Sequence, residues 1–382
     1  MNVEARARWV LDAVGGRELG FGDDVPYVEP EWEQVDAGVR PTAAGVAQAF
    51  YDLSRLEERD APRDRHGRFP ASASALDPLD PPLERLRSSL GLPSPRPLGA
   101  RFAVALTHDV DVLWRWTRRG VKGALWRARH GDLRQLLELA RAPLHRVRGT
   151  DPWWRFRELV EAERHAGVAS TFFVLGGHHA PEDGPDWGPL RGWLLETLTE
   201  LGVEIGAHPS YAAAEDPELL RRELDALRAT ADQVVGARYH YLRVDPLRNL
   251  APLEPLVDYD ASLGYADAIG FRSGLARPFR PWDHEREAPL DLVAVPTAAM
   301  DATLSEPHYL GLDPVVAERR LIALLDHAAE VGAAFSVIWH TERFDPATAR
   351  GWDRLYFRLI DAVREREGVC VPAGELAATM TP

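Results

Sequence analysis

The sequence predicts an α/β protein in which parallel strands alternate with helices. From residue 101 onward, short apolar runs are separated by longer stretches whose apolar residues recur with helical periodicity. Strands joined by single helices run parallel, and they form either a closed barrel or an open doubly wound sheet. No Gly-x-Gly-x-x-Gly motif follows the first predicted strand, which disfavours a dinucleotide-binding fold. In a barrel, the chemistry would gather at the carboxyl ends of the strands.

The predicted elements follow one another in a regular order. Strands are expected at 101–107, 169–175, 203–207, 238–243, 291–297 and 334–339. Helices are expected at 152–166, 190–201, 216–234, 314–331 and 346–366. Four helix starts are marked by an N-cap acid followed by proline at the first helical position: Asp151-Pro152, Asp216-Pro217, Asp313-Pro314 and Asp345-Pro346.

Residues 1–98 are predicted to form a smaller N-terminal α/β domain, and residues 99–382 the barrel. The stretch 78–97 is dense in prolines and has the composition of a connector between folding units. Upstream of it, 46–56 is a candidate amphipathic helix and 60–69 a charged loop. Nothing in this part has catalytic spacing.

Composition narrows the class of protein. With 382 residues and 45% apolar content, the chain can bury a sizeable core. Its net charge of −14 argues against general nucleic-acid binding, which needs a basic footprint. The single cysteine, Cys370, excludes an internal disulfide and a thiolate metal cluster. Residues 1–18 hold no uninterrupted apolar run of the kind a secretory signal needs, so a cytoplasmic location is expected.

One segment departs from the acidic balance. Residues 113–148 carry ten Lys/Arg against two Asp/Glu, with Trp114, Trp116 and Trp126 interleaved. This pattern suits contact with anionic lipid headgroups or with a phosphorylated glycan carrier. The alternative is a solvated basic helix pair, because a run of charged residues on a helix is often only its solvent-exposed face.

Two carboxylates one residue apart are the main chemical signal. Asp109 and Asp111 follow the apolar run 102–106, where the first predicted strand ends. Side chains at i and i+2 of a strand point to the same side of the sheet. One acid can then hold a cation while the other accepts or donates a proton.

Histidines near other strand ends could complete a metal site. His208 follows the short strand 203–207, and with Asp111 it could bind a borderline divalent ion. His240 is a further candidate ligand. The alternatives are a hydrogen-bonded loop histidine for His208 and an ordinary strand residue for His240.

Three more polar residues follow predicted strands. His340 could protonate a leaving amine as a general acid, or it could only cap a backbone carbonyl. Asp301 could hold His340 or contact substrate. Arg243 would orient a nearby carboxylate and keep it ionised, or form a structural ion pair. The aromatic side chains of the loop 264–282 could stack on sugar rings, or they could be local packing.

At these residues the chain resembles the polysaccharide deacetylases, the NodB-type carbohydrate esterases, over roughly residues 99–375. The family's acidic first motif is matched by Asp109 as the base and Asp111 as the metal ligand. Its last motif, a strand ending in histidine, is matched by 337–340. The segment 50–55, together with 67–69, also resembles the leading domain that precedes certain bacterial deacetylase-like domains.

Two motifs match only in part. The family's His-x-x-x-His places both histidines on the metal, but this chain has His208 followed by Ala212 at the second position. The Arg-x-Pro motif is matched at Arg243, but Asp245 stands where the motif has proline. A tight site needs three protein ligands, so either another residue such as His240 takes the place of the absent histidine, or the metal is bound weakly.

The resemblance implies a distorted (β/α) barrel and a metal-dependent hydrolase. A divalent ion, with zinc as the candidate, would be held by Asp111, His208 and His240. The enzyme would remove an N-acetyl or O-acetyl group from a carbohydrate in bacterial polysaccharide or glycoconjugate metabolism, with Asp109, His340 and Arg243 as catalytic residues. Two alternatives stay open: a glycan-binding protein without activity, and a metal-independent amidohydrolase of the same fold acting on a cyclic ureide or imide.

Overall fold

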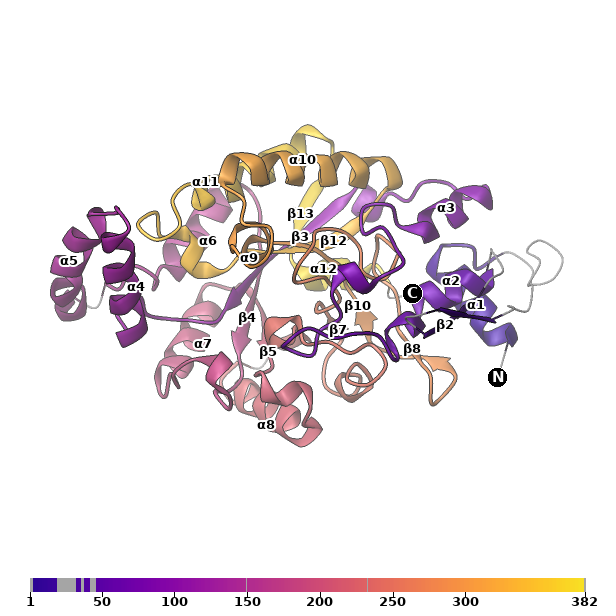
Figure 1. The fold of residues 1–382 in the computed structure, drawn as a ribbon, viewed down its shortest axis with the longest axis horizontal. Helices are drawn as coiled ribbons and strands as arrows, with labels where there is room; N and C mark the ends of the chain where they lie inside the picture. The colour runs from indigo at the N-terminus through magenta and orange to yellow at the C-terminus, as the bar shows by residue number, and fades with distance from the viewer. Residues whose placement is uncertain are drawn as a thin grey trace.

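The centre of the molecule is a curled sheet of parallel strands (Figure 1). The computed structural model describes residues 3–18, 32–35, 38–41, 46–148, 150–231 and 233–380. The sheet runs in the order β10-β7-β6-β5-β4-β3-β12-β11, and β13 also pairs with β3. Its strands are β3 (Ala103–Val110), β4 (Thr171–Leu175), β5 (Glu204–His208), β6 (Val234–Ala237), β7 (Tyr259–Asp260), β10 (Val293–Ala294), β11 (Thr297–Met300), β12 (Ala334–Ile338) and β13 (Val369–Val371).

The two edges of the sheet meet, so the sheet forms a distorted barrel. β10 pairs with β7 at one edge and β11 pairs with β12 at the other. Only Val295 and Pro296 separate β10 from β11, so one extended segment joins both edges. Proline cannot donate a ladder hydrogen bond, which fits a break in pairing at this point. The predicted α/β barrel is confirmed, and the open sheet is not what forms.

Helices cover the outside of the barrel in the predicted alternation. Figure 1 shows α10 and α11 along one side of the sheet and α7 and α8 along the other. The main covering helices are α6 (Phe156–His165), α7 (Leu190–Glu200), α8 (Pro217–Arg228), α10 (Pro314–Val331) and α11 (Trp352–Glu365). The short α9 (Asp301–Ser305) follows β11, and α12 (Ala373–Ala378) ends the chain. The first amides of α12 bond to Thr171 and Glu204, at the amino ends of β4 and β5.

Two of the four predicted helix starts are confirmed. The carboxylates of Asp216 and Asp313 each accept hydrogen bonds from two amides in the first turn of α8 and α10. The other two are wrong. α6 begins at Phe156 and α11 at Trp352, because Asp151 and Asp345 use their carboxylates to close turns before those helices.

The strand predicted at 238–243 is wrong. β6 ends at Ala237, and His240–Leu242 form a single 3₁₀ turn in which Tyr241 and Leu242 have φ of 61° and 54°. Alternating aromatic and polar residues resemble a strand in sequence, but here they lie on a turn at the rim. Arg238, rather than Arg243, is therefore the basic residue that directly follows a strand.

Residues from the first 98 pack against the barrel. Their elements are α1 (Val3–Ala13), β1 (Trp32–Val35), β2 (Gly38–Pro41), α2 (Val46–Leu53) and α3 (Pro82–Ser89), and α1, α2 and α3 lie at one end of the molecule (Figure 1). The buried Glu58 carboxylate accepts two hydrogen bonds from Arg272, at 2.6 and 2.9 Å. Trp9 contacts Trp282, which belongs to the hairpin of β8 (Trp282–Asp283) and β9 (Ala288–Pro289). Residues 1–2, 19–31, 36–37 and 42–45 of the predicted N-terminal domain lie outside the described residues, and the division at 98 stays a prediction.

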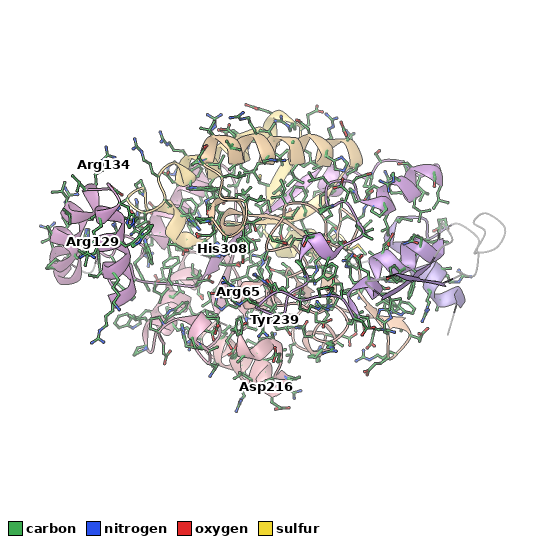
Figure 2. All side chains as sticks on the ribbon, viewed as in Figure 1. Arg65, Arg129, Arg134, Asp216, Tyr239 and His308 are labelled. Carbon is green, nitrogen blue, oxygen red and sulfur yellow. The ribbon has the colours of Figure 1, made fainter. Side chains whose placement is uncertain are left out.

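A helical hairpin protrudes from the opposite end of the molecule (Figure 1). It consists of α4 (Arg118–Arg129) and α5 (Arg134–Arg148), between β3 and α6, and Figure 2 labels Arg129 and Arg134 on it. Among the described residues, no helix combines the length and the apolar character needed to cross a membrane.

Glycines inside the barrel make room for large aromatic rings. A β-carbon at Gly236 would overlap the ring of Tyr259 on the neighbouring strand. We expect Gly236→Ala to lower the free energy of unfolding by about 1–3 kcal/mol, because the ring has no free volume to enter. Gly192→Ala, in α7, meets nothing within 4 Å and should raise stability by about 0.5–1 kcal/mol. Urea denaturation of both variants tests this, and equal effects would contradict it.

Candidate metal centre and active site

The carboxyl ends of the barrel strands bring the candidate residues to one rim. β3 carries Asp109 and leads into Asp111, β5 ends at His208, and Ile338 of β12 is followed closely by His340. Because the strands are parallel, these ends lie on the same side of the barrel. The convergence predicted from the sequence therefore occurs.

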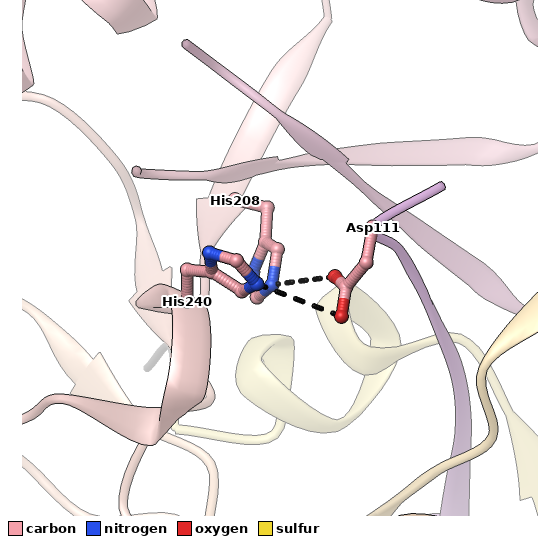
Figure 3. Close-up of side chains that lie close together, drawn as sticks. All are labelled: Asp111, His208 and His240. Carbon is pink, nitrogen blue, oxygen red and sulfur yellow. Dashed lines mark ion pairs between the residues drawn. The ribbon is translucent and has the colours of Figure 1, made fainter. Parts of the chain in front are cut away.

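Asp111, His208 and His240 form the tightest cluster (Figure 3). One ligand atom from each of the three lies within 4.8 Å of the other two. Nε2 of His208 is 3.2 Å from Oδ1 of Asp111, and Nε2 of His240 is 3.6 Å from Oδ2. A second histidine therefore joins His208 beside Asp111 although position 212 is alanine, and it is His240, from the turn after β6.

Hydrogen bonds on the far side of each imidazole set its orientation. Nδ1 of His208 donates to the carbonyl oxygen of Arg238 at 2.5 Å, and Nδ1 of His240 donates to Asp183 at 2.8 Å. With its proton on Nδ1, each neutral ring presents the lone pair of Nε2 toward Asp111. Metal-binding histidines are commonly held in this way.

The cluster fits a divalent cation. With both imidazoles neutral, Oδ1 of Asp111 is buried and has no hydrogen-bond partner in the described part of the chain. The bonds of about 2.0–2.2 Å that zinc forms are short enough for one cation to lie between the Asp111 carboxylate and the two imidazoles. Two imidazole nitrogens and one carboxylate oxygen are a donor set that suits zinc and similar borderline ions.

Without a cation, the cluster is a strongly coupled set of charges. Burial alone would raise the pKa of Asp111, but the imidazoles of His240, His208 and His340 hold that pKa well below its ordinary value. Burial alone would lower the pKa of His240, but the carboxylates of Asp111 and Asp183 raise it to about 9. The metal-free site therefore holds a proton that a bound cation would displace.

This coupling predicts how the stability of the chelated protein depends on pH. The pKa of His240 is raised from 6.5 to about 9 on folding, so protonated His240 stabilises the fold fully below pH 6.5. The contribution, on the order of 3 kcal/mol, is lost as pH rises toward 9. Urea denaturation with chelator at pH 6, 7.5 and 9.5 measures the loss.

His240→Gln is the control, because it removes the titrating group. The free energy of unfolding of this variant should therefore depend much less on pH. With zinc present, stability should instead rise with pH over the same range, since the imidazoles must lose their protons to bind. A chelated protein whose stability does not change between pH 6.5 and 9 would contradict the assignment.

Asp109 lies beside the cluster and is held by a buried arginine. Nη1 of Arg238 donates to Oδ1 of Asp109 at 2.7 Å and to Oγ1 of Thr107 at 2.7 Å. The guanidinium also lies 4.3 Å from the centre of the Phe173 ring. The second oxygen of Asp109, Oδ2, is 3.9 Å from Nε2 of His208 and faces the cluster. Arg238 therefore fixes the orientation of the Asp109 carboxylate, and the other oxygen of Asp109 points toward the candidate metal cluster.

His340 faces the cluster from the carboxyl end of β12, the strand next to β3. Its Nδ1 donates to Oδ1 of Asp301 at 2.6 Å, and its Nε2 lies 3.5 Å from Oδ2 of Asp111. Arg343 donates to the other oxygen of Asp301 at 3.2 Å. Burial would lower the pKa of His340, but Asp301 and Asp111 raise it well above its ordinary value. The expectation that Asp301 holds His340 is confirmed.

Arg243 does not make the predicted contact with a site carboxylate. Its guanidinium donates to the carbonyl oxygens of His66, at 2.8 Å, and Tyr211, pairs with Glu215, and stacks 3.9 Å from the centre of the Tyr211 ring. The reason is the early end of β6, which gives the carboxylate contact to Arg238. Its catalytic role stays a prediction, while the structural ion pair is present.

Two positioning residues, Arg238 and Asp183, were not predicted. Arg238 directly follows β6, and a correct strand boundary would have placed it at the rim. Asp183 lies in the loop after β4 and also accepts the backbone amide of Tyr211 at 2.7 Å. No local sequence signal connects it to His240, 57 residues away.

Part of the predicted charged loop lies at this rim. His66 is 3.2 Å from the hydroxyl of Tyr211, and Arg68 donates to the carbonyl oxygen of Tyr241 at 3.0 Å. Tyr241 in turn packs against His240. Residues 64–68 therefore form part of the wall of the candidate site, a role that was not predicted for the charged loop.

The aromatic residues of 264–282 were predicted as a possible stacking surface for sugars, and this is wrong. Tyr265, Phe271, Phe279 and Trp282 are each 3% exposed or less. They pack inside the protein, as Phe271 does against Phe335. Local packing, the alternative interpretation, accounts for them.

The barrel has the distorted barrel fold that occurs in proteins described as polysaccharide deacetylases. A protein from Pseudomonas aeruginosa PAO1, described as a polysaccharide deacetylase, matches with a TM-score of 0.50 and 14% identity over 81% of this chain and 99% of its own. Another so described, from Mycobacterium smegmatis, matches with a TM-score of 0.48 and 19% identity over 75% and 94%. The PuuE allantoinase matches with a TM-score of 0.49 and 13% identity over 81% and 99%.

No protein-family model and no curated protein sequence matches the chain. At 14% identity the likeness to the Pseudomonas protein shows the distorted barrel fold alone. The chemistry has to be argued from the residues of this chain.

Proposed function

We propose that the protein is a metal-dependent hydrolase that removes an acetyl group from a nitrogen or oxygen of a carbohydrate. The observation that carries the proposal is the cluster of Asp111, His208 and His240, with Asp109 and His340 facing it from two other positions on the rim. This set supplies a metal site, a base and an acid around one point. The carbohydrate as substrate is inferred from the resemblance to polysaccharide deacetylases.

A divalent ion, with zinc as the candidate, would supply a polarised acyl carbonyl and an acidified water at this site. Asp111, His208 and His240 would hold it, each already oriented by the contacts described above. Asp109 takes the proton of the attacking water, because its Oδ2 faces the cluster while Arg238 occupies its Oδ1. Arg238 holds this carboxylate in place through its hydrogen bond at 2.7 Å.

His340 donates a proton to the departing amine or alkoxide. Its raised pKa keeps the imidazole protonated at neutral pH, and Asp301 fixes the ring through Nδ1 so that Nε2 carries the reacting proton. Arg343 holds Asp301 in turn. After one turnover Asp109 has gained one proton and His340 has lost one, so the enzyme holds the same number of protons as before. Proton exchange with water then returns both residues to their starting states.

The glycan-binding alternative rested on the histidine missing at Ala212. His240 offers a nitrogen at the same cluster, so the site has three candidate protein ligands without that histidine. Three ligands with an open position are the usual arrangement of a catalytic zinc site. This favours the enzyme over the binding protein.

Metal analysis combined with an assay tests the proposal. We expect about one equivalent of zinc or a similar ion in the purified protein, and acetate release from a panel of N- and O-acetylated oligosaccharides that stops with chelator and returns with zinc. Asp111→Ala should lose both metal and activity.

Two outcomes would replace the proposal. Absence of metal, with glycan binding unaffected by Asp111→Ala, would indicate the binding protein. Hydrolysis of a cyclic ureide or imide that survives both chelation and Asp111→Asn would indicate the metal-independent amidohydrolase.

A further inference from the structure

The α4–α5 hairpin is firmly attached at its base. The buried Arg115, just before α4, binds Glu138 of α5 and Asp345 of the barrel, both at 3.1 Å. Gln135 accepts a hydrogen bond from Arg115 and donates to the carbonyl oxygen of Ala347 at 2.5 Å. The hairpin therefore presents a fixed outer face.

That outer face is unusually apolar. Eleven large hydrophobic residues are exposed in the described part of the chain, and six belong to the hairpin: Leu125, Trp126, Leu133, Leu136, Leu137 and Leu144. On α5 they recur at helical spacing, so they form a stripe along one side. Trp126 is 60% exposed and Leu137 63% exposed. An apolar patch of this kind marks a contact surface.

The same face is basic in an acidic protein. Residues 113–148 hold ten Lys/Arg and two Asp/Glu, while the whole chain has a net charge of −14. Arg118, Lys122 and Arg129 are exposed at helical spacing with Leu125 and Trp126 on α4. Exposed leucines and a tryptophan interleaved with basic residues are typical of helices that lie in a membrane interface.

We propose that the α4–α5 hairpin docks on an anionic membrane surface, with its leucines and Trp126 in the headgroup region and its arginines on lipid phosphates. Charge complementarity favours this occupant, because the hairpin is the basic part of an acidic chain. A second copy of the hairpin would bring like charges together. Nucleic acid would leave the leucine stripe without a partner.

Docking would place the candidate active site next to the membrane. Residues 112–117 alone connect Asp111 to α4, so the hairpin lies at the same end of the barrel strands as the metal cluster. This arrangement suits an acetylated glycan carried on a lipid. That substrate class rests on the proposed function, whereas the docking itself does not.

Sedimentation with vesicles tests the docking without any substrate. We expect the full-length protein to bind vesicles of phosphatidylcholine with 30% phosphatidylglycerol, and to bind phosphatidylcholine alone at least tenfold more weakly. High salt should weaken binding to the anionic vesicles. Arg129→Gln with Arg134→Gln should lower the partition coefficient by more than tenfold, at about fivefold for each basic side chain.

Matched variants outside the hairpin are the controls. Trp126→Ala should weaken binding severalfold, while Trp193→Ala, on α7 and 59% exposed, should not. Arg248→Gln removes an exposed charge elsewhere and should also leave binding unchanged. No binding to anionic vesicles, or equal binding by the hairpin and control variants, would overturn the proposal. So would a dimer in light scattering that the hairpin variants dissociate, because the face would then be covered by a second copy.

The two proposals can fail separately. Acetate release from soluble substrates without vesicle binding would overturn only the docking. Vesicle binding by a protein without metal or activity would overturn only the hydrolase.

Discussion

Replacing Arg238 with methionine is expected to lower the free energy of unfolding by about 3–5 kcal/mol. Arg238 is fully buried, and its partner Asp109 is 3% exposed. The variant would leave the carboxylate of Asp109 buried opposite an apolar side chain, and would also remove the donor to the carbonyl oxygen of Ala261 at 2.9 Å. Urea denaturation at pH 7 measures the loss.

A second substitution distinguishes the effect of the unpaired Asp109 carboxylate from that of a simple packing defect. Asp109→Asn added to Arg238→Met removes that charge, and the double variant should be more stable than Arg238→Met alone by about 1–3 kcal/mol. Arg243→Met is the matched control, because its carboxylate partner Glu215 is 75% exposed and stays hydrated when the arginine is lost, so no buried charge is left unpaired. If the double variant is no more stable than Arg238→Met, the charge pair is not what holds this part of the rim.

The fold could be predicted because its signals are local and repeated. The alternation of apolar runs with helical periodicity gave the parallel barrel, and Asp216 and Asp313 marked true helix starts. Asp151 and Asp345 failed because the same Asp-Pro pair also suits a turn. Its carboxylate accepts nearby amides whether or not a helix follows.

The site could be predicted where its residues continue a strand. Asp109, Asp111, His208 and His340 were found in this way, because strand ends in a parallel barrel share one rim. Arg238 was missed because a strand of four residues ends earlier than the aromatic pattern after it suggests. Asp183 was missed because its contact with His240 exists only once the loop after β4 folds over the rim.

His240 is a candidate ligand that no sequence motif marks. The chain has Ala212 at the position where the family resemblance predicts a second histidine. The turn after β6 brings an imidazole to the same cluster, and φ values of 61° and 54° at the next two residues shape that turn. Sequence alone offered His240 only as a candidate, because its strand assignment was wrong.

Asp109→Asn is expected to lower kcat for deacetylation by about 10²–10⁴-fold, the usual cost of losing a general base. Asparagine cannot take the proton of the attacking water, although its carbonyl oxygen can still accept the hydrogen bond from Arg238. The candidate metal ligands are untouched, so the content of bound metal should stay at the wild-type level. Steady-state assays and elemental analysis on the same preparation measure both quantities.

Comparison with Asp111→Asn distinguishes the loss of a general base from the loss of a metal ligand. Asp111 offers the carboxylate of the candidate metal cluster, so Asp111→Asn should lose metal and activity together. An Asp109→Asn variant that also lost its metal would make Asp109 a ligand and leave the site without an assigned base. If Asp109→Asn kept both metal and full activity, proton transfer would have to pass through His340, whose tight bond to Asp301 suits it to donate a proton rather than to accept one.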